Sequence, residues 1–449
     1  MIAAPLAALP DRESAVTRWL RRAPPSMFAL YGGASAFAAY FAMYAYRKPF
    51  AVASYSHIAG WPFALDFKIM LVIAQVAGYA LSKLIGIKIV SEMPPAHRAV
   101  AILLLIGFAE VALVGFAVAP PVVGVVALFL NGLGLGMIWG LVFGFLEGRR
   151  LTEILGAILC ASFIVSSGAV KAVGAALLVG AVTSERWMPA LTGLLFAPLL
   201  LLAVAALAQL PPPDARDEAE RAPRTPMDAR ARAAFFRAHA AGLVALIAVY
   251  VLLTAFRDFR DNFAAEIWRE LGFAGEAGIF AWSELPVAAV VLVALAMLTR
   301  VRDNRRGVIW NLVLVAAGLA TMGVVTAAFQ LGWLGPVGWM IAAGAGLYLA
   351  YVPFNALLFD RLIAAAHASG NAGFLIYVAD ASGYAGSVAL LLVRNFVHVL
   401  LPWTVFLCDI AYATSIIGLA ATAYGASRLL RELPTTTPAR GYDAATAGA

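Results

Sequence analysis

Long apolar runs separated by short polar segments recur along the whole chain. The runs lack the strict alternation of polar and apolar residues that marks a strand with one face in water. Apolar runs of about 18 residues or more predict transmembrane helices, because such a helix crosses the hydrocarbon layer and satisfies its own backbone. We therefore expect an all-α membrane protein with twelve spans, at 27–48, 67–90, 98–119, 122–146, 152–182, 187–210, 239–258, 276–299, 306–329, 333–358, 371–397 and 402–430.

One long polar segment divides these spans six and six. Residues 211–238 combine prolines with charges of both signs, a composition that cannot form an apolar core. We interpret the segment as a cytoplasmic linker between an N-terminal six-helix bundle, 27–210, and a C-terminal one, 239–430. Residues 1–26 and 431–449 are then cytoplasmic tails. The apolar run after residue 26 is too long for a signal peptide.

Composition and charge placement support this orientation. Of the 449 residues, 63% are hydrophobic and 13% charged, against about 25% charged in soluble proteins. The net charge of +7 does not point to nucleic acid, since Lys and Arg mark cytoplasmic loops of membrane proteins. The connections between the third and fourth and the ninth and tenth spans contain no Lys or Arg, whereas Arg300, Arg302, Arg305 and Arg306 follow the eighth span. We predict a multi-pass protein of the bacterial inner membrane with both termini in the cytoplasm.

The two halves also resemble each other in sequence. Residues 46–51 (YRKPFA) align with 259–264 (FRDNFA), and 134–149 align with 346–361, at offsets of 213 and 212 positions. Two six-span repeats of equal sense, joined by a cytoplasmic linker, resemble the major facilitator superfamily. This resemblance implies two pseudo-symmetric bundles with a substrate site between them, near the middle of the membrane.

Two adjacent cations, Arg47 and Lys48, stand at the end of the first predicted span. A charge at the bilayer centre costs about 2.5–3.5 kcal/mol on insertion scales, so adjacent cations need water or an anion nearby. Tyr40, Tyr44 and Arg47 share one helical face, and Pro49 is expected to bend or end the helix. Either the two cations reach the outer interface, or they face a cavity that takes an anion.

The seventh span carries Arg257, Asp258, Arg260 and Asp261 within little more than one turn. Arg257 and Asp261 are spaced to pair with each other, and such a turn would neutralise itself. The alternative places an arginine on the cavity, with acids that the substrate displaces. Arg260 is favoured because it is the repeat-mate of Arg47, and a guanidinium binds carboxylate or phosphate with two hydrogen bonds.

Several other polar residues lie within predicted spans. Lys83 either faces the cavity or pairs with an acid such as Glu92 or Glu147. Tyr351 and Tyr384 either orient a ligand or pack between helices. Intramembrane ionisable residues are functional candidates by default; here they include Glu110, Lys171, Glu284, Asp380 and Asp409. A buried carboxyl can exchange a proton, and the candidates for proton coupling are Glu284, Asp380, Asp258 and Asp261.

The sequence contains no nucleotide-binding loop, metal-ligand cluster or hydrolase nucleophile motif, so we expect neither an enzyme nor a cofactor. Cys160 and Cys408 fall in predicted spans and are interpreted as buried thiols.

Short segments resemble the organophosphate:phosphate antiporter family. They are Arg47-Lys48-Pro49-Phe50, the run from Gly78 to Ile85 (GYALSKLI), the run from Gly383 to Val388 (GYAGSV), and an arginine in the seventh span. The resemblance implies that Arg47, with Arg260 or Arg257, holds a phosphate group. The family's fifth-helix histidine is absent, with Ser166, Ser167 and Lys171 in its place. The whole pattern is also similar to an uncharacterised bacterial facilitator-like family.

We predict a monomeric secondary transporter for a small, plausibly phosphorylated organic anion, working by alternating access. Its candidate binding residues are Arg47, Arg260, Arg257, Lys48, Lys83, Tyr44, Tyr351 and Tyr384. Two other hypotheses remain open: a proton-coupled transporter of a neutral or cationic solute, and a non-transporting sensor or membrane partner protein.

Overall fold

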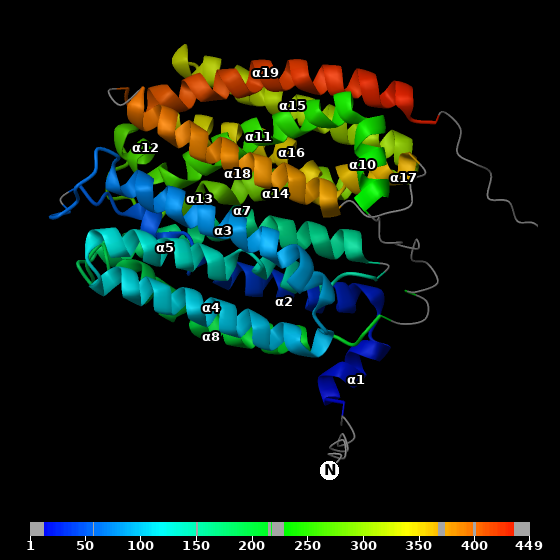
Figure 1. Cartoon of the computed structure of the whole chain (residues 1–449), viewed down its shortest axis with the longest axis horizontal. Helices are drawn as coiled ribbons and strands as arrows, with labels where there is room; N and C mark the ends of the chain where they lie inside the picture. Colours follow the sequence, from blue (N-terminus) through cyan, green and yellow to red (C-terminus); the bar gives the residue numbers. More distant parts are fainter. Residues whose placement is uncertain are drawn as a thin grey trace, which may run out of the picture.

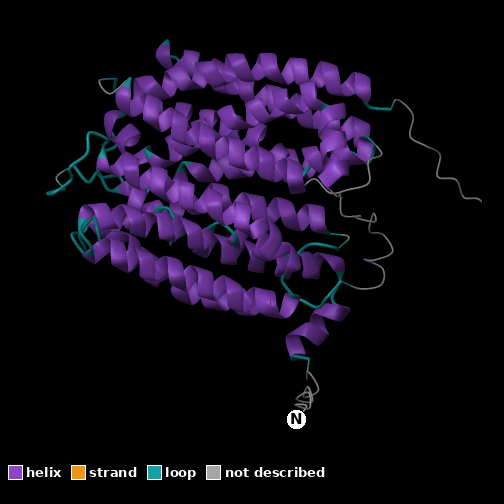
Figure 2. Ribbon diagram, viewed as in Figure 1, coloured by secondary structure: helices purple, strands orange, loops and turns teal. Residues whose placement is uncertain are grey.

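The computed structural model describes residues 13–56, 58–149, 151–213, 217, 229–366, 373–397 and 401–434. Every regular element in these ranges is a helix (Figure 2). Twelve of the described helices are long and apolar enough to cross a membrane, and six of them precede residue 211. The predicted all-α class and the twelve spans are confirmed. Most of the predicted linker lies outside the described residues. Residues 1–12 and 435–449 of the two predicted tails lie outside them as well.

The N-terminal half begins with a short helix, α1 (Ala15–Arg22), capped by the Ser14 side chain. Proline stands at the first position of three of its long helices, where the missing N–H leaves no hydrogen bond unmade. The spans are α2 (Pro25–Tyr44), α3 (Phe67–Glu92), α4 (Pro95–Val118), α5 (Pro121–Leu135) with α6 (Ile138–Phe143), α7 (Thr152–Val179) and α8 (Met188–Ala208).

The C-terminal half repeats this order after α10 (Ala229–Ala238), which lies within the predicted linker. Its helices are α11 (Ala240–Asn262), α12 (Ala264–Glu270), α13 (Ile279–Trp282), α14 (Glu284–Leu298), α15 (Asn304–Gln330), α16 (Pro336–Ala356), α17 (Leu358–Ala365), α18 (Gly373–Phe396) and α19 (Trp403–Glu432). Figure 1 shows the two sets of helices as two layers of the molecule, with the N-terminal half below.

The two halves meet along a few helices. α7 packs against α13 and α14, and α3 packs against α18. In Figure 1 these helices lie in the middle of the molecule, with α4 and α8 at one edge and α15 and α19 at the other. The polar side chains on α3, α7, α11 and α18 therefore face the junction between the halves.

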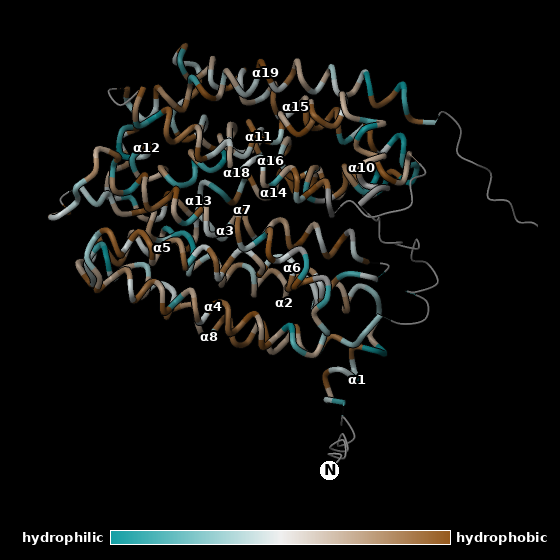
Figure 3. Tube along the Cα trace, in the orientation of Figure 1, coloured by the Kyte–Doolittle hydropathy of each residue, from teal (hydrophilic) through white to brown (hydrophobic). Residues whose placement is uncertain are grey.

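The outer surface of the bundles is apolar. Leu104 and Val111 on α4 are 68% and 69% exposed, and Leu202 on α8 is 70% exposed. Figure 3 shows hydrophobic residues along the lengths of these two helices, as expected for a surface in contact with lipid. The protein is a multi-pass membrane protein. Cys160 and Cys408 are buried free thiols, as predicted.

The first span ends earlier than the predicted residue 48. α2 stops at Tyr44, the chain turns over residues 45–48, and a 3₁₀ helix covers Pro49–Val52. Lys48 keeps helical backbone angles, and its N–H donates to the carbonyl oxygen of Tyr44 at 2.9 Å, but Pro49 supplies no N–H, so the regular hydrogen-bond ladder ends there. Pro49 to Val52 are nevertheless buried, so the turn lies inside the protein.

Close packing between α3 and α5 depends on glycine. A Cβ atom placed on Gly78 would lie 2.9 Å from the carbonyl carbon of Phe129, and one placed on Gly132 would lie 2.9 Å from the backbone N of Tyr79. Small residues at such positions let transmembrane helices approach closely.

We expect Gly78→Ala to lower the free energy of unfolding by about 1–3 kcal/mol, because the added methyl group overpacks rigid backbone. The matched control is Gly107→Ala on α4, where a Cβ atom would meet nothing within 4 Å. Thermal melting of the purified proteins measures both. Equal melting temperatures for the two variants would show that the α3–α5 contact tolerates separation.

Candidate functional site

The turn at 45–48 is held in place by two buried amides. Gln75 on α3 donates from Nε2 to the carbonyl oxygen of Arg47 (2.9 Å) and to Oδ1 of Asn131 (2.8 Å). Asn131 on α5 donates from Nδ2 to the carbonyl oxygens of Tyr46 (2.9 Å) and Ala109 (3.1 Å). The backbone N–H groups of Tyr46, Arg47 and Lys48 donate to carbonyl oxygens at the end of α2, and the two amides supply the partners that the buried carbonyl oxygens of Tyr46 and Arg47 need. The two amides therefore fix the backbone from which the Arg47 side chain projects.

Arg47 is 6% exposed and lies among tyrosine rings. Its guanidinium carbon is 3.8 Å from the centre of the Tyr79 ring and 5.7 Å from that of Tyr44. Tyr79 in turn contacts the Tyr384 ring edge-on, at 5.7 Å between centroids. Within the described ranges, the Arg47 guanidinium has neither an ion-pair partner nor a hydrogen-bond acceptor. Tyrosine faces attract a cation but do not neutralise it.

Arg257 is neutralised within its own turn. Its guanidinium lies 2.7 Å and 3.1 Å from Oδ1 of Asp258 and donates to the Tyr351 hydroxyl. Ser387 on α18 donates to the other Asp258 oxygen at 2.8 Å. The predicted pairing of Arg257 with Asp261 is wrong: Asp258 takes the arginine, and Asp261 turns toward the other half of the protein.

Asp261 joins the two halves. Its two carboxylate oxygens lie 2.5 Å from Nζ of Lys48 and 2.6 Å from Nζ of Lys171. Ser167 donates to the same carboxylate at 2.5 Å, and Lys48 also donates to Oδ1 of Asn262 at 3.0 Å. One acid of α11 thus holds two buried lysines of the N-terminal half.

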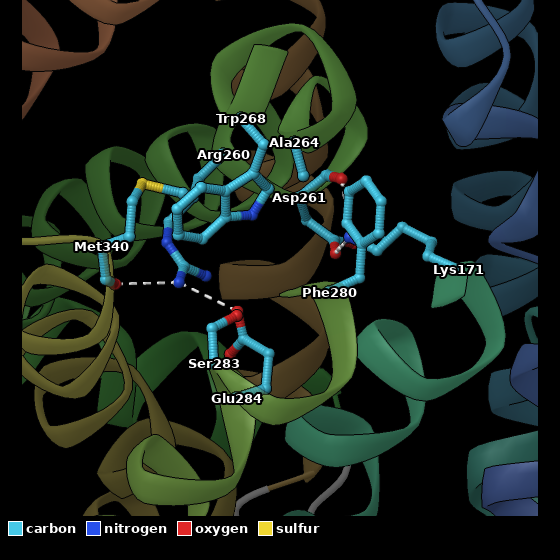
Figure 4. A pocket seen from close by; sticks show the side chains of 9 residues that line it. All are labelled: Lys171, Arg260, Asp261, Ala264, Trp268, Phe280, Ser283, Glu284 and Met340. Carbon is cyan, nitrogen blue, oxygen red and sulfur yellow. Dashed lines mark hydrogen bonds and ion pairs between the residues drawn. The ribbon is translucent and has the colours of Figure 1, made fainter. Parts of the chain in front are cut away.

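Arg260 is paired inside the C-terminal half. It lies 2.9 Å from Oε1 of Glu284 and donates to the carbonyl oxygen of Met340 at 3.0 Å. Figure 4 shows this pair on one side of a small cavity and the pair of Lys171 with Asp261 on the other. The cavity of about 10 Å³ has room for one water molecule. Its lining residues are Lys171, Arg260, Asp261, Ala264, Trp268, Phe280, Ser283, Glu284 and Met340.

Lys83 crosses from α3 to the C-terminal half and pairs with Asp380 on α18. Tyr250 donates to the second oxygen of Asp380, and its hydroxyl is 2.9 Å from that of Tyr351. Of the two alternatives for Lys83, the structure shows the pairing with an acid, but the acid is Asp380 and not Glu92 or Glu147. The partner lies on a helix of the other half, which the order of residues along one chain does not reveal.

Each of the four predicted proton-coupling acids thus pairs with a cation, Asp261 and Asp380 across the junction and Asp258 and Glu284 inside the C-terminal half. Arg47 does not line the cavity in Figure 4 that Arg260 lines. The role of the two buried amides, Gln75 and Asn131, was not predicted. The buried pair between Lys68 and Glu266, 2.5 Å apart, was not predicted either. A polar amide within an apolar span was the sequence signal that could have indicated the role of Gln75 and Asn131.

Charges at this junction do not balance. Apart from the pair of Lys68 with Glu266, six buried or half-buried cations among the described residues stand against four acids, Asp258, Asp261, Glu284 and Asp380. The cations are Arg47, Lys48, Lys83, Lys171, Arg257 and Arg260. Two positive charges are therefore uncompensated, one at Arg47 and one at the two lysines that share Asp261. In the part of the chain that the structure describes, no group of three His, Cys, Asp or Glu residues could hold a metal ion.

Solved structures of transporters share the fold. The peptide transporter POT in complex with sulfate superposes with a TM-score of 0.60 at 16% identity, covering 91% of this chain and 96% of the other. A bacterial homologue of the human drug peptide transporters gives 0.59 at 14% identity, with 90% and 100% covered. A POT mutant in complex with alafosfalin gives 0.58 at 17% identity, with 91% and 96% covered.

At these identities the likeness shows the fold alone, and that fold is the predicted major facilitator type, with twelve helices in two bundles of six. None of these findings supports the narrower resemblance to the organophosphate:phosphate antiporters. A comparison with curated proteins finds no match. A family model matches residues 49–429, which is most of the chain; Arg47 and Lys48 directly precede the matched range. The chain belongs to the family described as a family of unknown function, DUF5690.

Proposed function

We propose that this protein is a secondary transporter that moves a small organic anion across the bacterial inner membrane by alternating access. In this proposal it acts as a monomer with both termini in the cytoplasm. The observation that carries the proposal is the Arg47 guanidinium, which is buried between the halves and has no acid to neutralise it among the described residues.

An unpaired buried charge is costly, because the desolvation penalty in a protein is still several kcal/mol per ion. Such a charge is retained where a bound ligand of opposite charge neutralises it. The planar guanidinium offers paired N–H donors that match the oxygens of a carboxylate or a phosphoryl group. Because the Tyr79 ring covers one face of Arg47, an anion would approach the edge of the guanidinium, where those donors point.

The ion pairs between the halves suit alternating access. Lys48 and Lys171 pair with Asp261, and Lys83 pairs with Asp380, each across the junction. Rocking of the halves has to separate some of these pairs and expose the others. An incoming anion would replace the lost carboxylates as the partner of the freed cations. Arg257 and Arg260 would bind the anion only after releasing Asp258 and Glu284.

The same acids are proposed to take up protons when their pairs open. Asp258, Asp261, Glu284 and Asp380 each hold a cation in this conformation. A carboxylate next to a cation stays ionised, and loss of that cation in a water-excluded site favours the neutral acid.

Thermal melting of the purified protein against a ligand panel tests the proposal. The panel contains phosphate, sulfate, sugar phosphates, small carboxylates and dipeptides, with neutral sugars as controls. Binding to the folded state alone stabilises by about 2.7 kcal/mol at 100 times Kd, so a specific oxyanion should raise the melting temperature. Stabilisation by neutral solutes alone would contradict an anion site and favour the proton-coupled alternative.

Flux in proteoliposomes then separates a transporter from a sensor. A transporter exchanges the stabilising anion across the bilayer, whereas a sensor binds it without flux. Binding without exchange from either side would overturn transport while leaving the anion site intact.

A further inference from the structure

Glu110 lies inside the N-terminal bundle, away from the ion pairs at the junction. It belongs to α4, one residue after Ala109, whose carbonyl oxygen accepts a hydrogen bond from Asn131. Both carboxyl oxygens of Glu110 are buried, and in the described part of the chain neither has a hydrogen-bond partner. The proposed function makes no use of this acid.

The neighbouring helix provides the space for the carboxyl group. A Cβ atom placed on Gly193 of α8 would lie 2.5 Å from Oε2 of Glu110 and 2.9 Å from the ring of Tyr46. Gly193 therefore leaves a gap that the Glu110 carboxyl fills, against Tyr46 in the turn that carries Arg47.

The groups around this carboxyl do not compensate a negative charge. From the turn at 45–48 it meets the Tyr46 ring, and from α8 it meets Gly193. On α5, the Asn131 amide donates to Ala109 and Tyr46. Arg186, which precedes α8 in the chain, donates to the carbonyl oxygens of Phe116 and Ala119. Among the described residues Glu110 has no ion-pair partner.

An ionised carboxylate in this place would cost several kcal/mol, whereas the neutral acid costs far less. We infer that Glu110 is a proton-binding site of the N-terminal bundle and that it carries its proton in this conformation. This site is separate from the four acids at the junction, each of which pairs with a cation. The ligand of the site is a proton.

The contact with Tyr46 gives this proton a place in the transport cycle, and this step rests on the proposed function. Arg47 follows Tyr46 directly in the turn at 45–48, so a movement of the turn when an anion binds would uncover or cover the Glu110 carboxyl. The protonation state itself does not depend on whether the protein transports.

Infrared spectroscopy of the purified protein tests the inference without a substrate. A protonated carboxyl group absorbs at a higher carbonyl frequency than an ionised carboxylate or an amide. We expect the wild type at pH 7 to show a carboxylic acid band that Glu110→Gln removes completely. Glu284→Gln serves as the control and should leave that band unchanged, because Glu284 is paired with Arg260. Identical bands in the wild type and E110Q would overturn the inference.

A second measurement needs only the wild-type protein, in case E110Q does not fold. Dicyclohexylcarbodiimide is a lipid-soluble reagent to which a protonated carboxyl adds: the oxygen bonds to the central carbon and the proton passes to nitrogen. We expect mass spectrometry to find the adduct on the peptide that contains Glu110. Labelling at other acids only, or none at all, would contradict a protonated Glu110.

Discussion

Arg47→Gln is expected to lower the affinity for the stabilising anion by about 10- to 150-fold, because a charge-assisted hydrogen-bonded contact contributes about 1.5–3 kcal/mol. The unliganded variant should melt at the wild-type temperature or above it, since Gln removes a buried charge that has no acid partner. Titrating the anion while following thermal melting gives both values. Arg47→Lys keeps the charge but not the paired donors, so its loss of affinity should be smaller.

Two other arginines serve as controls for this result. Arg186→Gln makes the same change at a partly buried site of the same half, outside the junction, and should leave anion affinity unchanged. Arg260→Gln should have the opposite effect on the unliganded protein, a loss of about 3–5 kcal/mol, because it leaves Glu284 buried without its cation. If Arg47→Gln destabilised the unliganded protein as much as Arg260→Gln, Arg47 would be a structural residue.

The sequence repeat explains why these two arginines differ. Arg47 and Arg260 are equivalent positions, 213 residues apart, and both project from the end of the first helix of their half. The partner of Arg260 is Glu284, and the position 213 residues before it is Leu71, a fully buried apolar residue. The N-terminal half therefore has no acid where the C-terminal half has one. This asymmetry can be read from the sequence once the repeat is aligned.

Other pairings could not be predicted in this way. The twelve spans follow from apolar run length alone, and Pro49 indicated the end of the first helix. The partners of Lys83 and Lys171 lie on helices of the opposite half, and the chain order does not say which helices meet. Arg257 had two acids within reach, and sequence spacing favoured Asp261. In the structure Asp261 pairs with two lysines instead, and Asp258 pairs with Arg257.

One contact between the halves joins two residues that the sequence repeat aligns with each other. Lys48 and Asp261 occupy equivalent positions, and they pair with each other at 2.5 Å. Equivalent residues of two repeats meet only near the axis that relates the repeats. The two halves therefore place a cation and an acid at the same point of the same turn, where the bundles touch.

Asp261→Asn is accordingly expected to be the most disruptive single change at the junction, with a loss of about 3–5 kcal/mol in the free energy of unfolding. The carboxylate is the partner of both Lys48 and Lys171, whose side chains are 5% and 6% exposed, so its loss leaves two buried ammonium groups without an acid. Thermal melting of the purified variant measures the effect.

Asp409→Asn on α19 makes the same change at an exposed acid and should cost less than about 0.5 kcal/mol. Adding Lys171→Met to Asp261→Asn should restore part of the lost stability, because one of the two unpaired cations is removed. A double variant no more stable than Asp261→Asn alone would show that the lysines do not need this acid. The junction would then be held by helix packing, and rocking of the halves would not depend on separating the pair of Lys48 with Asp261.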